Sequence, residues 1–122
     1  AGTTAPYSFG DAPSELTRYG WYNGNAQGRT QLVRQLLPNA WGLFDMHGNL
    51  WEWCADWYAA DYYAGFLPAD PQGPAEGAFR VVRGGSWTNP PRFLRSAFRS
   101  WETPAVRSGN VGFRVAADVP AR

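Results

Sequence analysis

The clearest alternation of side chains lies in residues 50–54, and it predicts a β-strand. Trp51 and Trp53 fall on one face of this strand, while the opposite face carries Leu50, Glu52 and Cys54. A carboxylate on a buried face is costly unless it is paired. The pattern therefore predicts that Glu52 has a partner.

The rest of the chain predicts short elements separated by turns. Further strands are expected at residues 79–83 and 111–116, each ending or beginning at glycine, and residues 14–19 fit one capped helical turn. Fourteen Gly and ten Pro break up the other stretches, and no period of 3.6 residues persists long enough for a full helix. Residues 60–78 predict an irregular connection. We therefore expect a loop-rich α+β fold.

Aromatic rings supply much of the material for a core. The chain has 122 residues, the size of one small domain, and 16% of them are Phe, Trp or Tyr.

No run approaches the ~20 apolar residues of a membrane span, and residues 1–4 carry neither a basic nor an apolar targeting segment. We expect a soluble chain without membrane contact and slightly favour the cytoplasm. The start without Met predicts a fragment or a processed product.

The chain contains a single cysteine, Cys54, and a single histidine, His47. One cysteine excludes an internal disulfide and a thiolate metal cluster. One histidine excludes a two-histidine metal site and leaves a lone base without an evident nucleophile. We interpret Cys54 as a packed small hydrophobic residue and His47 as a structural or loop residue.

Charged residues are segregated along the chain. One segment contains acids but no Arg or Lys: Asp45, Glu52, Asp56, Asp61, Asp70 and Glu76. In the next segment a lone acid, Glu102, lies among arginines: Arg80, Arg83, Arg92, Arg95, Arg99, Arg107 and Arg114. Such asymmetry occurs in nucleic-acid-binding proteins, but arginine without lysine also suits planar pairing with carboxylates. Because the acids lie directly upstream, we favour internal ion pairs over a nucleic-acid partner.

Three blocks of sequence stand out. They are Pro-Asn-Ala-Trp-Gly-Leu-Phe-Asp-Met-His-Gly-Asn-Leu-Trp-Glu-Trp at residues 38–53, Arg-Val-Val-Arg-Gly-Gly-Ser-Trp at residues 80–87, and Arg-Ser-Ala at residues 95–97 with Gly-Phe-Arg at residues 112–114. In order and spacing they resemble the formylglycine-generating-enzyme (sulfatase-modifying-factor) family. The resemblance runs from about residue 1 to residue 118 and implies a C-type-lectin-like fold with short antiparallel strands. It also implies that residues 1–122 are a single domain, the C-terminal part of the family domain, with the missing N-terminal part as an expected partner.

In the first block, carboxylates flank main-chain carbonyls in a pattern that suits a hard cation. The resemblance implies a structural calcium held by the side chains of Asp45 and Glu52 and by the carbonyls of Gly48 and Leu50. The alternative is that the second carboxylate pairs with a buried arginine, such as Arg83 or Arg114.

Catalytic members of the family hold copper with two cysteines, because thiolates are soft ligands for Cu(I). The resemblance places the second of these positions at Ser96 and the first near Pro91, and neither residue can replace a thiolate. Cys54 lies far along the chain from them and is not expected to stand in for the pair. A related branch uses histidine-ligated iron, whose ligands belong to another domain. We therefore expect no copper.

Members of this fold family, notably the variable proteins of diversity-generating retroelements, present the segment that matches residues 88–108 as a display surface. We expect a non-catalytic module that binds a protein or another surface ligand through Thr88, Arg92, Phe93, Leu94, Phe98, Ser100, Trp101, Glu102, Val106 and Ser108. For each ring in this set, a core position is an equally good interpretation. Adenine-directed mutagenesis of asparagine codons does not readily give Trp or Glu, so Trp101 and Glu102 would be fixed or have another origin.

Two other classes of function stay open. One is an enzyme, either a divergent formylglycine-generating oxidase with other ligands or a hydrolase around Ser86, Ser96 or His47, although no Ser-His-Asp spacing or nucleophile elbow supports a hydrolase. The other is a regulatory domain of a larger signalling protein, since such domains are often fused to kinases or NTPases. Gene context discriminates among these classes.

Overall fold

The computed structural model describes residues 3–65 and 69–117. The ends of the expected domain, residues 1–2 and 118–122, and residues 66–68 of the expected connection lie outside these ranges. The described elements are η1 Pro13–Arg18, β1 Gly20–Trp21, β2 His47–Gly48, β3 Trp51–Trp57, β4 Arg80–Arg83, η2 Pro91–Leu94, β5 Arg99–Glu102 and β6 Val111–Gly112, where η is a 3-10 helix. The helical turn expected at residues 14–19 and the strand expected at residues 79–83 are confirmed to within one residue, but the expected cap is not formed, because Ala12 precedes the helix and makes no side-chain capping hydrogen bond.

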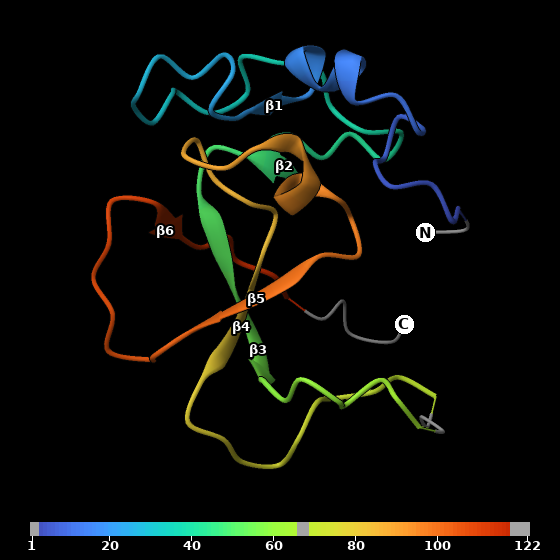
Figure 1. The fold of residues 1–122 in the computed structure, drawn as a ribbon, viewed down its shortest axis with the longest axis vertical. Coiled ribbons are helices and arrows are strands. Elements are labelled where there is room, and N and C mark those ends of the chain that lie inside the picture. The colour runs from blue at the N-terminus through green and yellow to red at the C-terminus, as the bar shows by residue number, and fades with distance from the viewer. Residues whose placement is uncertain (1–2, 66–68, 118–122) are drawn as a thin grey trace.

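Four strands form the main sheet, in the order β5, β4, β3, β6, and β1 pairs with β2 in a second sheet (Figure 1). The central strand β4 has antiparallel neighbours on both sides, β3 and β5. β6 pairs with β3 in parallel, and β1 pairs with β2 in the same way, so parallel pairs accompany the expected antiparallel ones. The structure confirms a loop-rich α+β fold with short strands.

Strand β3 is longer than the alternation in residues 50–54 indicates. Its pairing with β4 shifts between Trp53 and Trp57, which marks a β-bulge or an irregularity of the ladder. Such a shift interrupts the two-residue alternation, so the second half of the strand leaves no regular pattern in the sequence. At the other edge, β6 covers only the first two residues of the strand expected at residues 111–116, because the chain then leaves the sheet.

Glycine lets β1 and β2 approach each other closely. A side chain at Gly20 would place its Cβ 2.0 Å from the carbonyl oxygen of His47, and one at Gly48 would place it 2.1 Å from that of Trp21. Gly48 also has a φ of +86°, in the left-handed region that favours glycine. The close contact between β1 and β2 fixes the position of the first sequence block, residues 38–53, just before that block enters the main sheet at β3.

The core is small and joins the N-terminal segment to η2. Its centre is formed by Tyr7, Leu16 and Leu94, with partly buried rings packed against it: Phe9, Tyr22 and Phe93. The rings of Tyr7 and Phe9 stack with their centroids 5.0 Å apart. Val81 and Val82 of β4 are also buried. Large rings thus supply much of the core, as the composition predicts.

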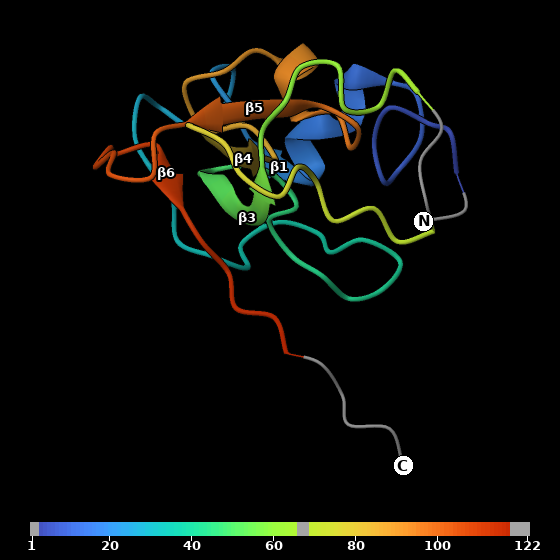
Figure 2. The ribbon, with the colours of Figure 1, turned by 90° about the horizontal axis from the view of Figure 1, so that it is seen from below.

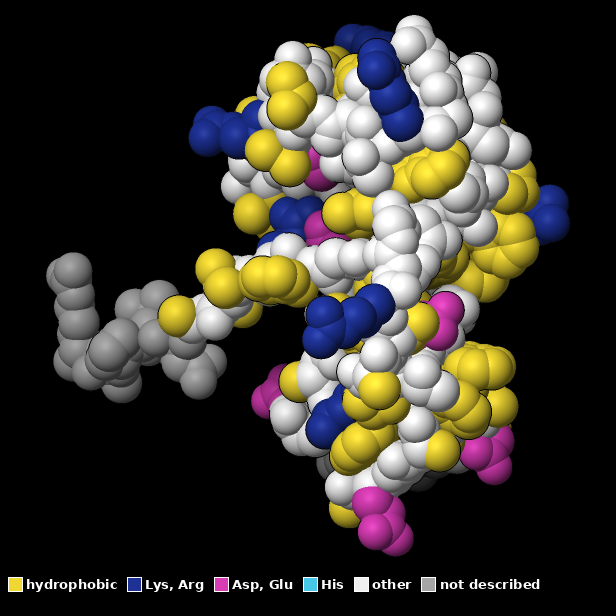
Figure 3. Space-filling view, turned by 90° about the vertical axis from the view of Figure 1, so that its left-hand side faces the viewer, with side chains coloured by type: hydrophobic (Ala, Val, Ile, Leu, Met, Phe, Trp, Pro, Cys, Tyr) yellow, Lys and Arg dark blue, Asp and Glu magenta, His cyan; other side chains and the backbone are white. Residues whose placement is uncertain are grey.

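Many large apolar side chains lie at the surface: Leu32, Val33, Leu37, Trp41, Leu43, Tyr63, Trp101, Phe113 and Val115. Phe113 and Val115 are 76% and 87% exposed and lie just after β6, where the chain runs away from the body of the molecule (Figure 2). Figure 3 shows hydrophobic side chains along this extension. Folded domains rarely leave a large contiguous apolar surface uncovered. Neither of the short helices in the described ranges is long and apolar enough to cross a membrane.

Candidate functional site

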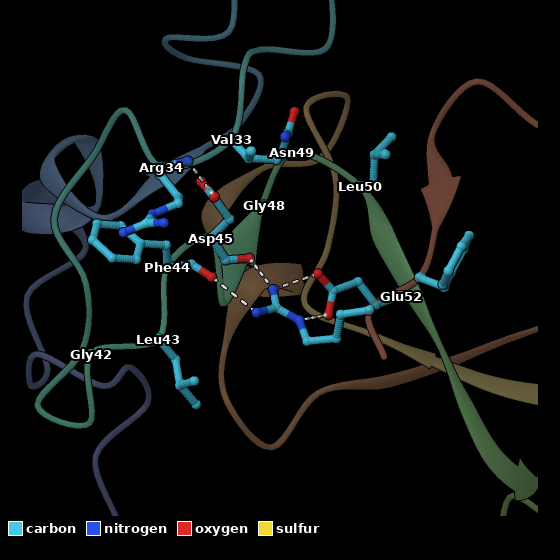
Figure 4. Close-up of a pocket in the computed structure, with 12 residues that line it drawn as sticks. Val33, Arg34, Gly42, Leu43, Phe44, Asp45, Gly48, Asn49, Leu50 and Glu52 are labelled. Atoms are coloured by element: carbon cyan, nitrogen blue, oxygen red, sulfur yellow. Dashed lines mark hydrogen bonds and ion pairs between the residues drawn. The ribbon is translucent and has the colours of Figure 1, made fainter. Parts of the chain in front are cut away.

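A cavity of about 490 Å³ lies at the predicted cation site. All four predicted ligand residues line it: Asp45, Gly48, Leu50 and Glu52. Gly48 comes from β2 and Glu52 from β3, and the short turn between these strands keeps their residues together (Figure 4). The fold therefore brings to one cavity the residues that the first sequence block singles out.

Arg114 occupies the side of this cavity nearest to Glu52. Its Nε and Nη2 donate to the two carboxylate oxygens of Glu52, each at 2.5 Å (dashed lines in Figure 4). It also donates to the carbonyl oxygens of Phe44 and Asp45, each at 3.1 Å. The hydrogen bonding with Glu52 raises the pKa of Arg114. Of the two arginines named as possible partners of Glu52, Arg114 takes that role in the structure.

Asp45 presents one carboxylate oxygen that has no partner in the described part of the chain. Its backbone φ is +56°, which is uncommon for a residue other than glycine. Its Oδ2 accepts the N–H of Arg34 at 2.8 Å, whereas Oδ1 is buried and has no hydrogen-bond partner among the described residues. An unpaired buried carboxylate oxygen is costly, and a hard cation is one group that would satisfy it. Asp45 thus offers one oxygen to a hard cation, and Glu52 can join it only if Arg114 releases the carboxylate.

A larger cavity, of about 840 Å³, shares Glu52 and Arg114 with the first and is also lined by Ser96, one of the two positions at which the family resemblance implies cysteine. Cys54 and Ser96 both line it, although they lie far apart in the sequence. Distance along the chain therefore does not keep Cys54 out of the cavity that Ser96 lines. Burial raises the pKa of the Cys54 thiol, so the protonated form is favoured. A single protonated thiol and a serine hydroxyl differ from the thiolate pair that Cu(I) prefers.

His47 is a buried residue whose two ring nitrogens are both engaged. Its Nε2 accepts the N–H of Ser8 at 3.2 Å, so the proton lies on Nδ1, which donates to the carbonyl oxygen of Leu94 at 2.7 Å. Ser8 Oγ lies 2.9 Å from the same Nε2. Burial lowers the pKa of His47 and favours the neutral ring. The serine beside this histidine is Ser8, not Ser86 or Ser96, and no sequence spacing indicated it.

The predicted display segment, residues 88–108, forms η2, the edge strand β5 and the loops around them. Four of its predicted contact residues are exposed, Thr88, Arg92, Trp101 and Ser108, and five are half-buried, Phe93, Phe98, Ser100, Glu102 and Val106. Leu94, in contrast, is fully buried. The prediction that Leu94 contacts a ligand is wrong, because this side chain packs in the core with Tyr7 and Leu16.

The three rings of the segment occupy different environments. Phe93 packs against the core cluster and meets Phe98 edge-on, with centroids 5.0 Å apart. Trp101 is 45% exposed and rests on Phe79, with centroids 4.2 Å apart, and on Tyr58 at 6.3 Å. Sequence reasoning missed these two supporting rings because they flank an irregular connection that carries no periodic signal. Trp101 is thus the ring of the three that is both supported and exposed.

The strand pattern, the short turns and the residues of these cavities define a C-type-lectin-like domain, and solved structures of this fold resemble it. Residues 2–119 match the model of the sulfatase-modifying factor enzyme 1-like domain. The chain belongs to that family, the family of the formylglycine-generating enzymes.

Among its relatives, the formylglycine-generating enzyme of Streptomyces coelicolor is 42% identical over 129 residues, which cover 92% of this chain and 40% of that enzyme. The serine/threonine-protein kinase pkn1 of Chlamydia pneumoniae is 44% identical over 92 residues, covering 74% of this chain and 15% of the kinase. Among solved structures, Treponema denticola variable protein 1 has a TM-score of 0.85 and 38% identity, covering 92% of this chain and 40% of that one. The chain spans less than half the length of these relatives.

Proposed function

We propose that the chain is a non-catalytic binding module that presents residues 88–108 to a protein or another surface ligand. The observation that carries this proposal is Trp101, which is 45% exposed on the edge strand β5 and is nevertheless held by Phe79. A large ring that is already positioned loses little freedom on binding and makes a good anchor. The similarity to Treponema denticola variable protein 1 supports a display role like that of the variable proteins of diversity-generating retroelements.

The chemistry of the larger cavity supports a binding role rather than an oxidase. The only cysteine, Cys54, has a raised thiol pKa, and Ser96 offers a hard hydroxyl oxygen. Cu(I) gains little from such ligands, because it prefers a pair of thiolates. The similarity to formylglycine-generating enzymes is what keeps a divergent oxidase as the alternative.

The test uses the full-length protein and a peptide selected against it from a random displayed library. We expect Trp101→Ala to weaken binding of the selected peptide by about tenfold or more, since anchor rings dominate such interfaces. Tyr63→Ala is the matched control, because this ring is 49% exposed and lies outside the segment. Equal affinities of the wild-type protein and the Trp101→Ala variant would contradict the proposal.

A second candidate is a regulatory domain within a larger signalling protein. It is favoured by the 44% identity to the kinase pkn1, of which the matching region forms only 15%. A kinase domain encoded in the same gene would support this candidate, whereas a neighbouring reverse-transcriptase gene would support the display role.

We also propose that the remaining part of the family domain is a partner of this chain. The matched region is 40% of Treponema denticola variable protein 1, so that protein has other polypeptide to pack against it. Here Val33, Leu43 and Phe113 line the smaller cavity and are 66%, 43% and 76% exposed. Burial of such side chains stabilises an assembly by about 25 cal/mol per Å² of apolar surface. This apolar rim, Val33, Leu43 and Phe113, is the proposed contact.

A structural calcium at Asp45 completes the proposal. The Oδ1 of Asp45, which has no partner among the described residues, supports it, and Gly48 and Leu50 line the same cavity. A bound calcium would supply positive charge to this oxygen, while Asp45 keeps the Arg34 N–H on its other oxygen. If the cation replaced Arg114 as the partner of Glu52, the Glu52 carboxylate would become a second ligand.

A further inference from the structure

The larger cavity has an excess of positive charge. Four fully charged residues line it: Glu52, Arg83, Arg95 and Arg114. Glu52 and Arg114 neutralise each other through two hydrogen bonds of 2.5 Å. Among residues 3–65 and 69–117, the ion pairs are Arg18–Glu15 and Arg114–Glu52, so neither Arg83 nor Arg95 has a carboxylate partner there.

Main-chain carbonyls hold both unpaired guanidiniums in place. Arg83 Nη2 donates to the carbonyl oxygen of Ser96, and Arg95 Nε donates to that of Arg92 at 2.9 Å. Arg95 also lies 6.0 Å from the ring centre of Phe98. A guanidinium carries five N–H donors, so each of these side chains keeps donors for a ligand. Because they are already positioned, a carboxylate that binds them loses less side-chain entropy.

Arg114 shows the contrasting case of a guanidinium that is already occupied. It makes hydrogen bonds to both oxygens of Glu52 and to the carbonyls of Phe44 and Asp45. Arg83 and Arg95 make one such bond each within the described chain. The arginines that can receive an incoming anion are therefore these two, and both are exposed.

Apolar side chains complete the wall of the cavity. Trp41, which is 63% exposed, lines it together with Met46 and Trp53. Pockets for organic ligands combine apolar walls with a few convergent polar groups in this way. Binding of a polynucleotide calls for several cations spaced along its phosphate backbone, whereas this cavity has two available guanidiniums at one place.

We infer that this cavity binds an acidic peptide segment of a protein partner, whose carboxylates pair with Arg83 and Arg95 while an apolar side chain packs on Trp41. The inference rests on the proposed binding function, because Arg95 and Ser96 belong to the displayed segment 88–108. It assigns the class of ligand: a segment rich in Asp or Glu. Bidentate pairing of arginine with carboxylate supplies the direction and the strength of the contact.

The experiment titrates the full-length protein with a fluorescein-labelled peptide of alternating Asp and Gly and follows fluorescence anisotropy. Saturable binding that weakens with added salt is expected. Arg83→Glu and Arg95→Glu should each lower the affinity by about tenfold or more, since each places a repelling charge where an attracting one was. Arg29→Glu is the matched control, an exposed arginine outside the cavity, and should leave the affinity unchanged.

Arg83→Glu also breaks the bond to Ser96 and can disturb the fold, so Arg95→Glu decides the outcome if Arg83→Glu lowers the melting temperature. Failure of the Asp–Gly peptide to bind, equal binding of the matching Asn–Gly peptide, or tighter binding of a single-stranded oligonucleotide would each overturn the inference. None of these outcomes bears on catalysis. Oxidation of a cysteine peptide by the protein would instead overturn the proposed binding function itself.

Discussion

The Glu52 carboxylate receives two hydrogen bonds from Arg114, and the same guanidinium holds the carbonyls of Phe44 and Asp45. One residue that follows β6 thus ties β3 to the loop before β2. The pair is partly exposed, with 38% of the Arg114 side chain and 24% of the Glu52 side chain accessible. Solvent screening therefore limits what it contributes, and a moderate effect on stability is expected.

Glu52→Gln should lower the free energy of unfolding by about 1 to 2 kcal/mol, because the amide keeps the shape but loses the charge-assisted bonds. Chemical denaturation of the full-length protein measures this loss. Asp56→Asn, a half-buried acid of the same strand with no ion pair among the described residues, is the control and should change stability less. Equal effects of the two substitutions would show that the Arg114 contact contributes little.

Calcium makes a separate prediction for Asp45. A ligand that binds only the folded state raises the melting temperature, so added calcium should stabilise the protein and a chelator should reverse this. Asp45→Asn should abolish the response, because Oδ1 is the carboxylate oxygen without a partner among the described residues. A melting temperature that is unchanged on calcium removal would leave the pairing of Arg114 with Glu52 as the better account of this site.

Among the elements of the display segment, β5 and η2 have different roles. Strand β5 lies at the edge of the sheet and carries Trp101, whereas η2 carries Leu94 into the core. Leu94 and Trp101 are seven residues apart in a segment for which the sequence alone predicts one contact surface. Substitutions in the two elements should therefore separate recognition from folding.

Leu94→Ala should cost about 2 to 5 kcal/mol of stability, since it opens a space in a small core. Trp101→Ala should cost about 1 kcal/mol and keep the fold, because its ring is half exposed and loses mainly the contact with Phe79. Thermal melts of the two variants check this order. If Trp101→Ala unfolds the protein, the ring belongs to the core and is not available for recognition.

The sequence predicts elements well where a pattern is local. Residues 50–54 alternate regularly and lie at β3, whereas β1 and β2 cover two residues each and leave no periodic signal. The predicted cation ligands, which line the smaller cavity, could be identified from the sequence because they all lie in one continuous block, residues 38–53. Arg114 was one of two candidates for Glu52, and strand pairing does not decide between them, because Arg83 lies directly across from Glu52 on β4. The choice depends on the side chains: the Arg83 guanidinium donates to the carbonyl oxygen of Ser96, and the Arg114 guanidinium pairs with Glu52. Contacts such as Ser8 with His47 depend on tertiary packing, which spacing alone does not encode.

At the scale of the whole molecule, the described chain combines a small buried core with many exposed large apolar residues. The family relatives are more than twice as long as the region that they share with this chain. The two observations together favour a domain whose surface is completed by further polypeptide.

Residues 1–122 expressed alone should therefore associate or bind a hydrophobic dye, because the apolar rim at Val33, Leu43 and Phe113 is uncovered. Phe113→Asp should reduce dye binding and association, and Ser14→Asp, at an exposed polar position elsewhere, should not. Size-exclusion chromatography with light scattering and dye fluorescence measure both. A monomer of the unmodified chain with a cooperative melt and no dye binding would contradict the need for a covering partner.

We propose that this chain binds a ligand and does not catalyse the family's oxidation. The most direct test incubates the full-length protein with a cysteine-containing sulfatase peptide, copper and oxygen, and follows the peptide by mass spectrometry. Because the family resemblance places Ser96 and the region of Pro91 where a thiolate pair is needed, we predict that the mass of the peptide does not change. The mass change that accompanies conversion of its cysteine to formylglycine would contradict the account.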